Sequence, residues 1–114
     1  MERLKRRADF LAAATGSKAP AAGFVLQVRR RDQDGPIRVG FTVSKRAGNS
    51  VERNRIRRRL REVVRLTGPS VMKAGYDYVL IGRRDALRLP SEKITQEFSR
   101  ALTRVHSGPK AARA

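Results

Sequence analysis

Apolar residues recur along this chain with two different periods, and these periods predict its secondary structure. At residues 24–29 and 37–43 they occupy every second position, which is typical of half-buried strands. The turn-forming cluster at residues 32–36 lies between the two strands, so we expect a hairpin. The solvent-facing side of this pair carries Gln27, Arg29, Arg38, Gly40 and Thr42. Gly40 adds no side chain there, which leaves room for a flat group.

The remaining pattern predicts one more strand and three helices. Residues 76–81 form an apolar run broken only by Asp77, which indicates a strand covered on both faces. A short helix is expected at residues 9–14. A last helix is expected after Pro90, with a buried stripe of Ile94, Phe98, Ala101, Leu102 and Val105. A longer helix begins near Ser50, behind a capping box made by Asn49 and Glu52, and ends by Gly68–Pro69.

This order of elements, α-β-β-α-β-α, predicts a two-layer α/β (α+β) sandwich with helices on a small mixed sheet. One extra short strand could lie near Lys45. We expect a single domain at residues 1–106, including a mobile basic arm at residues 1–7 and a loop at 15–22. Residues 107–114 are expected to be a disordered basic tail.

Residues 45–65 combine a high positive charge with an apolar stripe. The chain has 27 Lys and Arg against 10 Asp and Glu, a formal net charge of +17. In the long helix, Ile56, Leu60, Val63 and Val64 form an apolar stripe, and Asn54, Arg57, Arg58, Arg61 and Arg65 lie opposite it. Arg55 and Arg59 lie on a flank, and Arg53 near the apolar edge. A solvated helix would intersperse more acids, so we expect a nucleic-acid partner.

Residues suited to catalysis are scarce. The chain lacks cysteine, and its one histidine, His106, is expected to be a solvated residue near the end of the last helix. No carboxylate cluster or nucleophile with a positioned base is evident. No signal peptide or membrane-spanning run is evident either, so we expect a cytoplasmic protein that uses no catalytic or metal-binding residues of its own.

The kind of nucleic acid follows from what surrounds the basic helix. The chain has no helix-turn-helix spacing, zinc ligands or heptads, and a helix beside an open strand face suits RNA better than a DNA groove. A structural ribosomal protein would have a similar composition, so that alternative stays open. A protein-only nuclease is disfavoured because its metal ions need gathered oxygen ligands.

Residues 44–62, SKRAGNSVERNRIRRRLRE, resemble the signature of the bacterial ribonuclease P protein component, with Arg53-Asn54-Arg55 at its centre. Residues 4–10, 38–44 and 76–83 resemble the flanking segments of that family. The resemblance implies the non-catalytic protein subunit of an endoribonuclease, which removes the 5′ leader of precursor tRNA. It further implies that the partner RNA is catalytic and holds most of the magnesium, with no obligate protein partner. A left-handed β-α-β crossover through the basic helix is also implied.

The resemblance assigns roles to individual positions. Contact with the catalytic RNA is implied for Lys45, Arg46, Asn49, Arg53, Asn54, Arg55, Arg57, Arg58, Arg61 and Arg65. The cleft for the leader is expected to be lined by Phe10, Gln27, Arg29, Arg38 and Thr42.

Two positions depart from the family's pattern. Ala14 and Gln27 stand where the family often has aromatic residues, so leader stacking would depend on Phe10. Burial in the core is an equally good interpretation of Phe10 itself.

Overall fold

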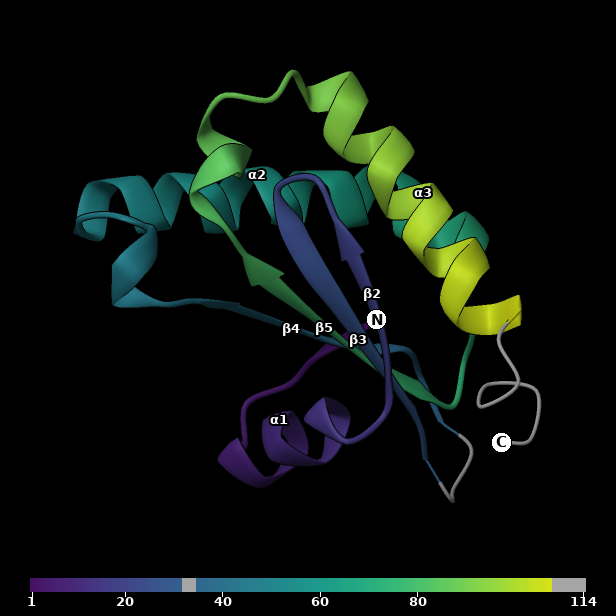
Figure 1. Ribbon diagram of the computed structural model, residues 1–114. Helices are drawn as coiled ribbons and strands as arrows, with labels where there is room; N and C mark the ends of the chain where they lie inside the picture. The colour runs from purple at the N-terminus through teal and green to yellow at the C-terminus, as the bar shows by residue number, and fades with distance from the viewer. Residues whose placement is uncertain (32–34, 108–114) are drawn as a thin grey trace.

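The computed structural model describes residues 1–31 and 35–107, and a five-stranded mixed sheet forms its centre (Figure 1). The strands are β1 (Glu2–Arg3), β2 (Ser17–Ala21), β3 (Phe24–Arg30), β4 (Arg38–Val43) and β5 (Tyr76–Gly82). The helices are α1 (Arg7–Ala14), α2 (Ser50–Val71) and α3 (Ser91–Ser107), with short 3₁₀ turns η1 (Lys45–Ala47) and η2 (Arg84–Leu87). The expected α/β class with a mixed sheet is confirmed.

The strand order is β1-β4-β5-β3-β2. The predicted hairpin between residues 24–29 and 37–43 is therefore wrong, because β5 lies between β3 and β4 and pairs with both. β5 is the strand that is buried on both faces, so the central place in the sheet suits it best. β4 and β5 are parallel and are joined through α2, which makes the expected β-α-β crossover. Residues 32–34 of the expected turn lie outside the described residues.

Two short edge strands were not foreseen. Glu2 and Arg3, expected in a mobile arm, pair in parallel with β4, and Leu4 beside them is only 6% exposed. Residues 17–21, expected in a loop, pair antiparallel with β3. Pro20 is tolerated there because β2 has a neighbour on one side only. The tight connection from β2 to β3 is possible because Gly23 adopts a φ of 90°.

The basic helix begins where the sequence predicts it. The side chain of Asn49 accepts a hydrogen bond from the backbone N–H of Glu52, and the Glu52 carboxylate accepts one from Asn49. The predicted end at Gly68–Pro69 is wrong, because α2 continues to Val71. Gly68 is buried, and a Cβ placed on it would lie 2.7 Å from the sulfur of Met72 and 3.2 Å from Val64, so the last turn is closely packed despite the proline. The extra strand expected near Lys45 is a 3₁₀ turn instead.

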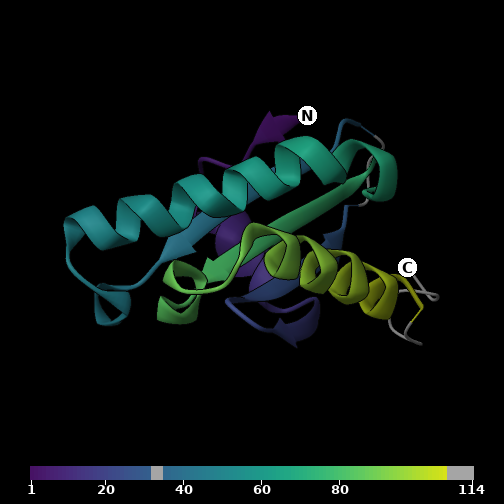
Figure 2. The same ribbon diagram turned by 90° about the horizontal axis from the view of Figure 1, so that it is seen from above.

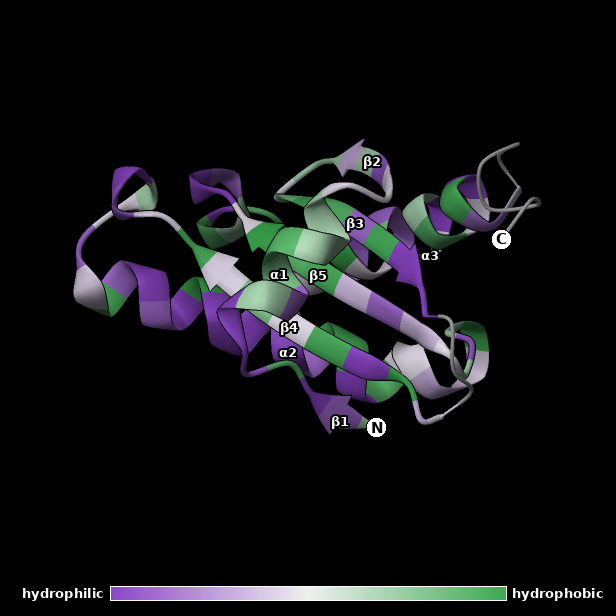
Figure 3. Cartoon of the chain, turned by 90° about the horizontal axis from the view of Figure 1, so that it is seen from below, coloured by the Kyte–Doolittle hydropathy of each residue, from purple (hydrophilic) through white to green (hydrophobic). Residues whose placement is uncertain are grey.

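The helices divide unequally between the two faces of the sheet. α2 and α3 lie side by side over one face (Figure 2), and α1 crosses the other (Figure 3). The predicted apolar stripes of both long helices are buried against the first face, together with Phe24, Leu26, Tyr78 and Leu80. On the second face a small cluster of Leu4, Ala13 and Val79 supports α1, and polar stretches of the strands stay uncovered beside the helix (Figure 3).

Candidate nucleic-acid interface

The solvent-facing side of α2 and the turn before it carry most of the predicted RNA-binding residues. Exposed are Lys45, Arg46, Asn49, Asn54, Arg55, Arg58, Arg61 and Arg65, while Arg53 and Arg57 are half-buried. Of these ten residues, Arg65 alone forms an ion pair within the described residues, with Glu62 at 2.5 Å. Arg57 donates a hydrogen bond to the Asn54 amide oxygen at 3.0 Å. Most of these cations therefore remain available to an anion.

One arginine of α2 has a structural function. Arg59 is half-buried, and its guanidinium donates hydrogen bonds to the backbone carbonyls of Ala86 and Leu89. These contacts fasten η2 and the start of α3 to α2. Arg59 is the last of three consecutive arginines, and its place on the helix flank was the one feature of the sequence that distinguished it from the other two.

A second arginine, which the sequence analysis missed, fixes the turn that carries Lys45 and Arg46. Arg84 donates to the carbonyl of Ala47 at 3.1 Å and to the carboxylate of Glu52 at 3.0 Å. The hydrogen bond from Arg84, with that from the Asn49 backbone, lowers the pKa of Glu52 below its usual value. The turn is thus tied to both α2 and η2, which follows β5.

A cleft of about 500 Å³ opens between α1 and the sheet. Its lining is formed by Lys5, Arg7, Phe10, Leu11, Ala14, Gln27, Phe41, Thr42, Val79 and Ile81. The structure thus brings together three of the residues expected around the leader, namely Phe10, Gln27 and Thr42. Lys5, Arg7 and Leu11 were missed. The helical spacing of Arg7, Leu11 and Ala14 was the signal that could have placed them on one face.

Arg29 and Arg38 do not line this cleft. Both carboxylate oxygens of the buried Asp77 accept hydrogen bonds from Arg38, at 2.6 and 2.7 Å, and Arg31 donates a third at 2.7 Å. Arg38 also lies 3.4 Å from the carboxylate of Asp9. Burial alone would raise the pKa of Asp77, but the two guanidinium groups lower it below its usual value. Arg38 thus links α1 to the sheet.

Phe10 both packs on the sheet and lines the cleft. A Cβ placed on Gly40 would lie 2.5 Å from the Phe10 ring, so that ring fills the space that the glycine leaves. Phe10 also packs on the cluster around Leu4 and forms part of the cleft wall. One aromatic ring therefore both seats α1 and faces the cleft.

His106 is not the solvated residue that the sequence led us to expect. Its Nε2 lies 2.8 Å from the hydroxyl of Tyr78, and its ring packs edge-on against Tyr76 and Tyr78. Within the described residues, no three His, Cys, Asp or Glu side chains gather as a metal site would require. None of the helices in the same part of the chain has the length and apolar character needed to cross a membrane.

Comparison with known proteins identifies the family. The family model for ribonuclease P matches residues 1–106. The chain belongs to the ribonuclease P protein family. A ribonuclease P protein component from Paramagnetospirillum magneticum is 49% identical over 110 residues, covering 92% of this chain and 83% of the relative. The Bartonella quintana protein component is 45% identical over 106 residues, covering 88% of this chain and 80% of the relative.

Solved structures agree with this assignment. The ribonuclease P protein of Staphylococcus aureus superposes with a TM-score of 0.75 at 28% identity, covering 90% of this chain and 94% of that one. The protein from Thermotoga maritima gives the same TM-score at 27% identity, covering 92% and 98%. As a ribonuclease P protein, the chain is one component of an endoribonuclease of tRNA processing whose RNA is the catalyst. Its partner is ribonuclease P RNA, and the alternative of a ribosomal protein receives no support.

Proposed function

We propose that the exposed face of α2 and its preceding turn bind ribonuclease P RNA, and that the cleft under α1 receives the 5′ leader of precursor tRNA. The observation that carries this proposal is the separation of the two surfaces. One is a ridge of arginines of which, among the described residues, Arg65 alone has a carboxylate partner, and the other is a hollow with an aromatic wall. The first suits a folded phosphate backbone and the second a single strand.

The composition of the cleft supports the leader as its occupant. Lys5 and Arg7 supply positive charge along the wall, while Phe10 supplies a ring against which a base can stack. Ala14 and Gln27 both line the cleft at positions where the family often has aromatic residues. The ring of Phe41, which also belongs to the lining, lies against Arg61 of α2. Stacking therefore depends on Phe10, and a larger share of leader affinity comes from charge.

Magnesium ions for leader removal do not fit this chain's own side chains, because the described residues gather no set of three possible ligands. The phosphates of the partner RNA would hold them, and the protein's part is to neutralise charge around that RNA. We assign this activity to the cytoplasm, as expected from the sequence.

Reconstitution tests the proposed function. The chain is mixed with a ribonuclease P RNA at a magnesium concentration too low for the RNA alone, and leader cleavage is measured. We expect the protein to restore cleavage of precursor tRNA and to bind this RNA in preference to heparin. Cleavage that stays at the level of the RNA alone would refute the proposal.

Salt dependence tests the role of the arginine ridge. About 6–10 phosphate contacts would lower RNA affinity by about 10³–10⁵ between 50 and 200 mM salt. Arg58→Gln removes an exposed cation of α2 and should reduce the slope of log K against log salt by about one. Arg88→Gln, an exposed cation at the end of η2, is the matched control and should leave the slope unchanged.

A further inference from the structure

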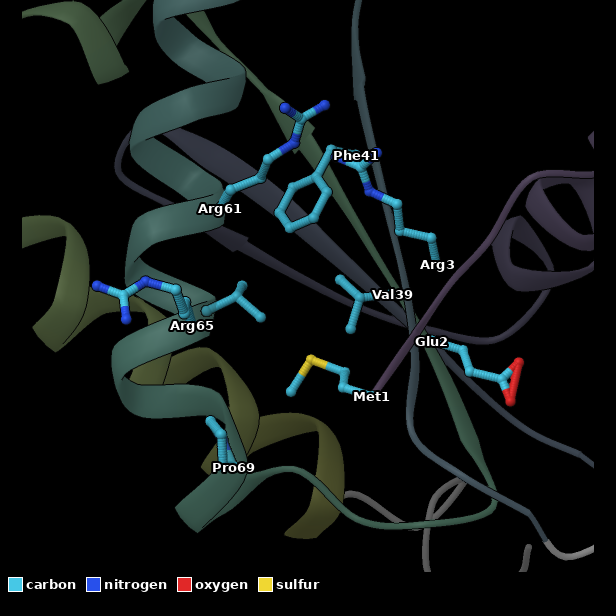
Figure 4. A pocket seen from close by; sticks show the side chains of 9 residues that line it. Met1, Glu2, Arg3, Val39, Phe41, Arg61, Arg65 and Pro69 are labelled. Carbon is cyan, nitrogen blue, oxygen red and sulfur yellow. The ribbon is translucent and has the colours of Figure 1, made fainter.

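A second hollow lies between α2 and the strands β1 and β4, on the sheet face opposite the cleft under α1 (Figure 4). We call it the edge groove, and its volume is about 260 Å³. Its lining comprises Met1, Glu2, Arg3, Val39, Phe41, Arg61, Val64, Arg65 and Pro69. Val39, Phe41 and Val64 give it an apolar floor, and the arginines stand along its rim.

Two guanidinium groups lie near one another at the rim of this groove. The guanidinium carbon of Arg61 lies 5.9 Å from the centroid of the Phe41 ring, and Arg3 of β1 is close enough to Arg61 to repel it (Figure 4). Within the described residues, neither Arg3 nor Arg61 has a carboxylate within ion-pair distance. Glu2 contributes to the wall, but its carboxylate points away from the groove (Figure 4).

The charges at this rim are not balanced by the protein. Partial burial, together with repulsion from Arg3 and Arg57, lowers the pKa of Arg61. An anion between Arg3 and Arg61 would relieve this repulsion, and a flat ring beneath it would cover the apolar floor. A nucleotide has both parts, a phosphate and a base, in one unit.

We propose that the edge groove binds one unstacked nucleotide of ribonuclease P RNA, with its base against Phe41 and its phosphate between Arg3 and Arg61. The inference rests on the proposed binding of that RNA to α2. It adds a pocket for one nucleotide beside the positively charged face of this helix. The volume lies below the ~300–1,000 Å³ of ordinary small-molecule sites, which favours a single ring system. Proteins commonly bind RNA through such splayed bases.

The position of the groove relates it to the leader cleft. Phe41 belongs to the linings of both hollows, which lie on opposite faces of β4. A nucleotide seated in the edge groove therefore places the partner RNA on the far side of the strand that bounds the cleft. Binding of the two RNAs would then fix the same strand from both faces.

Affinity measurements at several salt concentrations test the nucleotide site. Phe41→Leu removes the ring without changing any charge, so it should weaken binding of ribonuclease P RNA by about 5- to 150-fold, the range for one lost stack. The slope of log K against log salt should stay that of the wild type. Phe41→Tyr keeps the ring and should bind as the wild type does.

A second pair of variants consists of one that blocks the groove without changing its floor and one that serves as its control. Pro69→Phe adds a ring at an exposed position of the groove wall, and Leu66→Phe adds the same ring on the same helix outside the lining. Pro69→Phe should weaken RNA binding by a factor similar to that of Phe41→Leu, and Leu66→Phe should not. Thermal unfolding of each variant shows whether it is folded. If Phe41→Leu does not fold, the comparison of Pro69→Phe with Leu66→Phe tests the nucleotide site.

The nucleotide inference is overturned if the folded Phe41→Leu and Pro69→Phe variants bind the RNA as tightly as the wild type. A wild-type chain with no preference for ribonuclease P RNA would instead refute the proposed function, whatever the groove variants do. The wild-type and variant arms therefore report on the two proposals separately.

Discussion

The two faces of the sheet are built in different ways. Among the described residues, twenty buried side chains form the cluster between the sheet and α2 with α3, whereas three form the cluster under α1. The first face can supply most of the hydrophobic stabilisation, which scales with the apolar area removed from water. The second face is therefore able to stay partly open, and it is there that the cleft lies.

The largest effect is expected from damage to the packed face. Phe98 of α3 is fully buried and packs on Phe24 with ring centroids 6.3 Å apart. Phe98→Ala should lower the free energy of unfolding by about 3–5 kcal/mol, because it leaves a cavity in the main core. Urea denaturation measures this loss. A loss under 1 kcal/mol would mean that the packed face is not the main source of stability.

On the open face, an ionic cluster replaces much of the missing apolar packing. Asp77→Asn removes the charge that Arg31 and Arg38 share, and should lower the free energy of unfolding by about 1.5–3 kcal/mol. Because the pKa of Asp77 is lowered in the folded chain, this stabilisation is present above pH 3.8 and is lost as the pH falls through the folded pKa. The variant should lack that acid-induced loss.

Urea denaturation at several acidic pH values measures the contribution of Asp77. Glu92 is an exposed residue of α3 that forms no ion pair within the described residues, and Glu92→Gln is the matched control. An acid profile of Asp77→Asn that follows the wild type would assign the loss to other carboxylates.

The sequence predicted the elements of the packed face better than it predicted contacts between remote segments. Regular spacing revealed the apolar stripes of α2 and α3 and the alternation of β3 and β4, because burial against one continuous core imposes a period. The hairpin error arose because strand order depends on contacts between distant segments, and the intervening place of β5 leaves no mark near residues 24–43.

The candidate site was predicted in part for a similar reason. The arginines of α2 could be assigned to the exposed face from spacing and from the family resemblance. Spacing could not show that Arg38 is held by Asp77, or that Arg59 is held by the backbone at Ala86, because both partners come from remote segments. The short strands β1 and β2 carried too few residues for a period to emerge.

A smaller effect, on RNA binding rather than on stability, is expected from a change in the aromatic wall of the cleft. Phe10→Ala should weaken binding of precursor tRNA to the holoenzyme by about 1–3 kcal/mol and leave mature tRNA, which lacks a leader, unaffected. Its effect on unfolding should be smaller than that of Phe98→Ala, because Phe10 is only half-buried. Equal losses on both tRNAs would show that Phe10 acts only through packing.

The open face should also accept a gain of function. Ala14 lines the cleft beside Phe10, at a position where the family often has an aromatic residue. Ala14→Phe should strengthen precursor tRNA binding by about 1 kcal/mol through a second stacking surface. Ala8→Phe, which adds the same ring to an exposed position of α1 outside the lining, should not. An Ala14→Phe variant no tighter than the wild type would place the leader elsewhere.

The smallest effect expected is a loss of stability near neutral pH, caused by protonation of His106 on the packed face. His106 lies at the packed face against Tyr76 and Tyr78, and its burial, with the nearby Lys73, lowers its pKa below 6.5. The unfolded chain therefore takes up a proton before the folded one does. Stability is complete above pH 6.5 and falls as the pH drops through the folded pKa of His106. A weak loss near neutral pH should thus precede the loss caused by Asp77 below pH 3.8.

His106→Gln should remove the first of these two losses and keep the second, because the amide can still bond the Tyr78 hydroxyl without titrating. Thermal unfolding between pH 7.5 and 3 measures both steps, and Asp77→Asn should show the converse pattern. If His106→Gln instead kept the loss near neutral pH, a group other than His106 would cause it. The assignment of that loss to the packed face would then fail, and only the loss caused by Asp77 on the open face would keep its explanation.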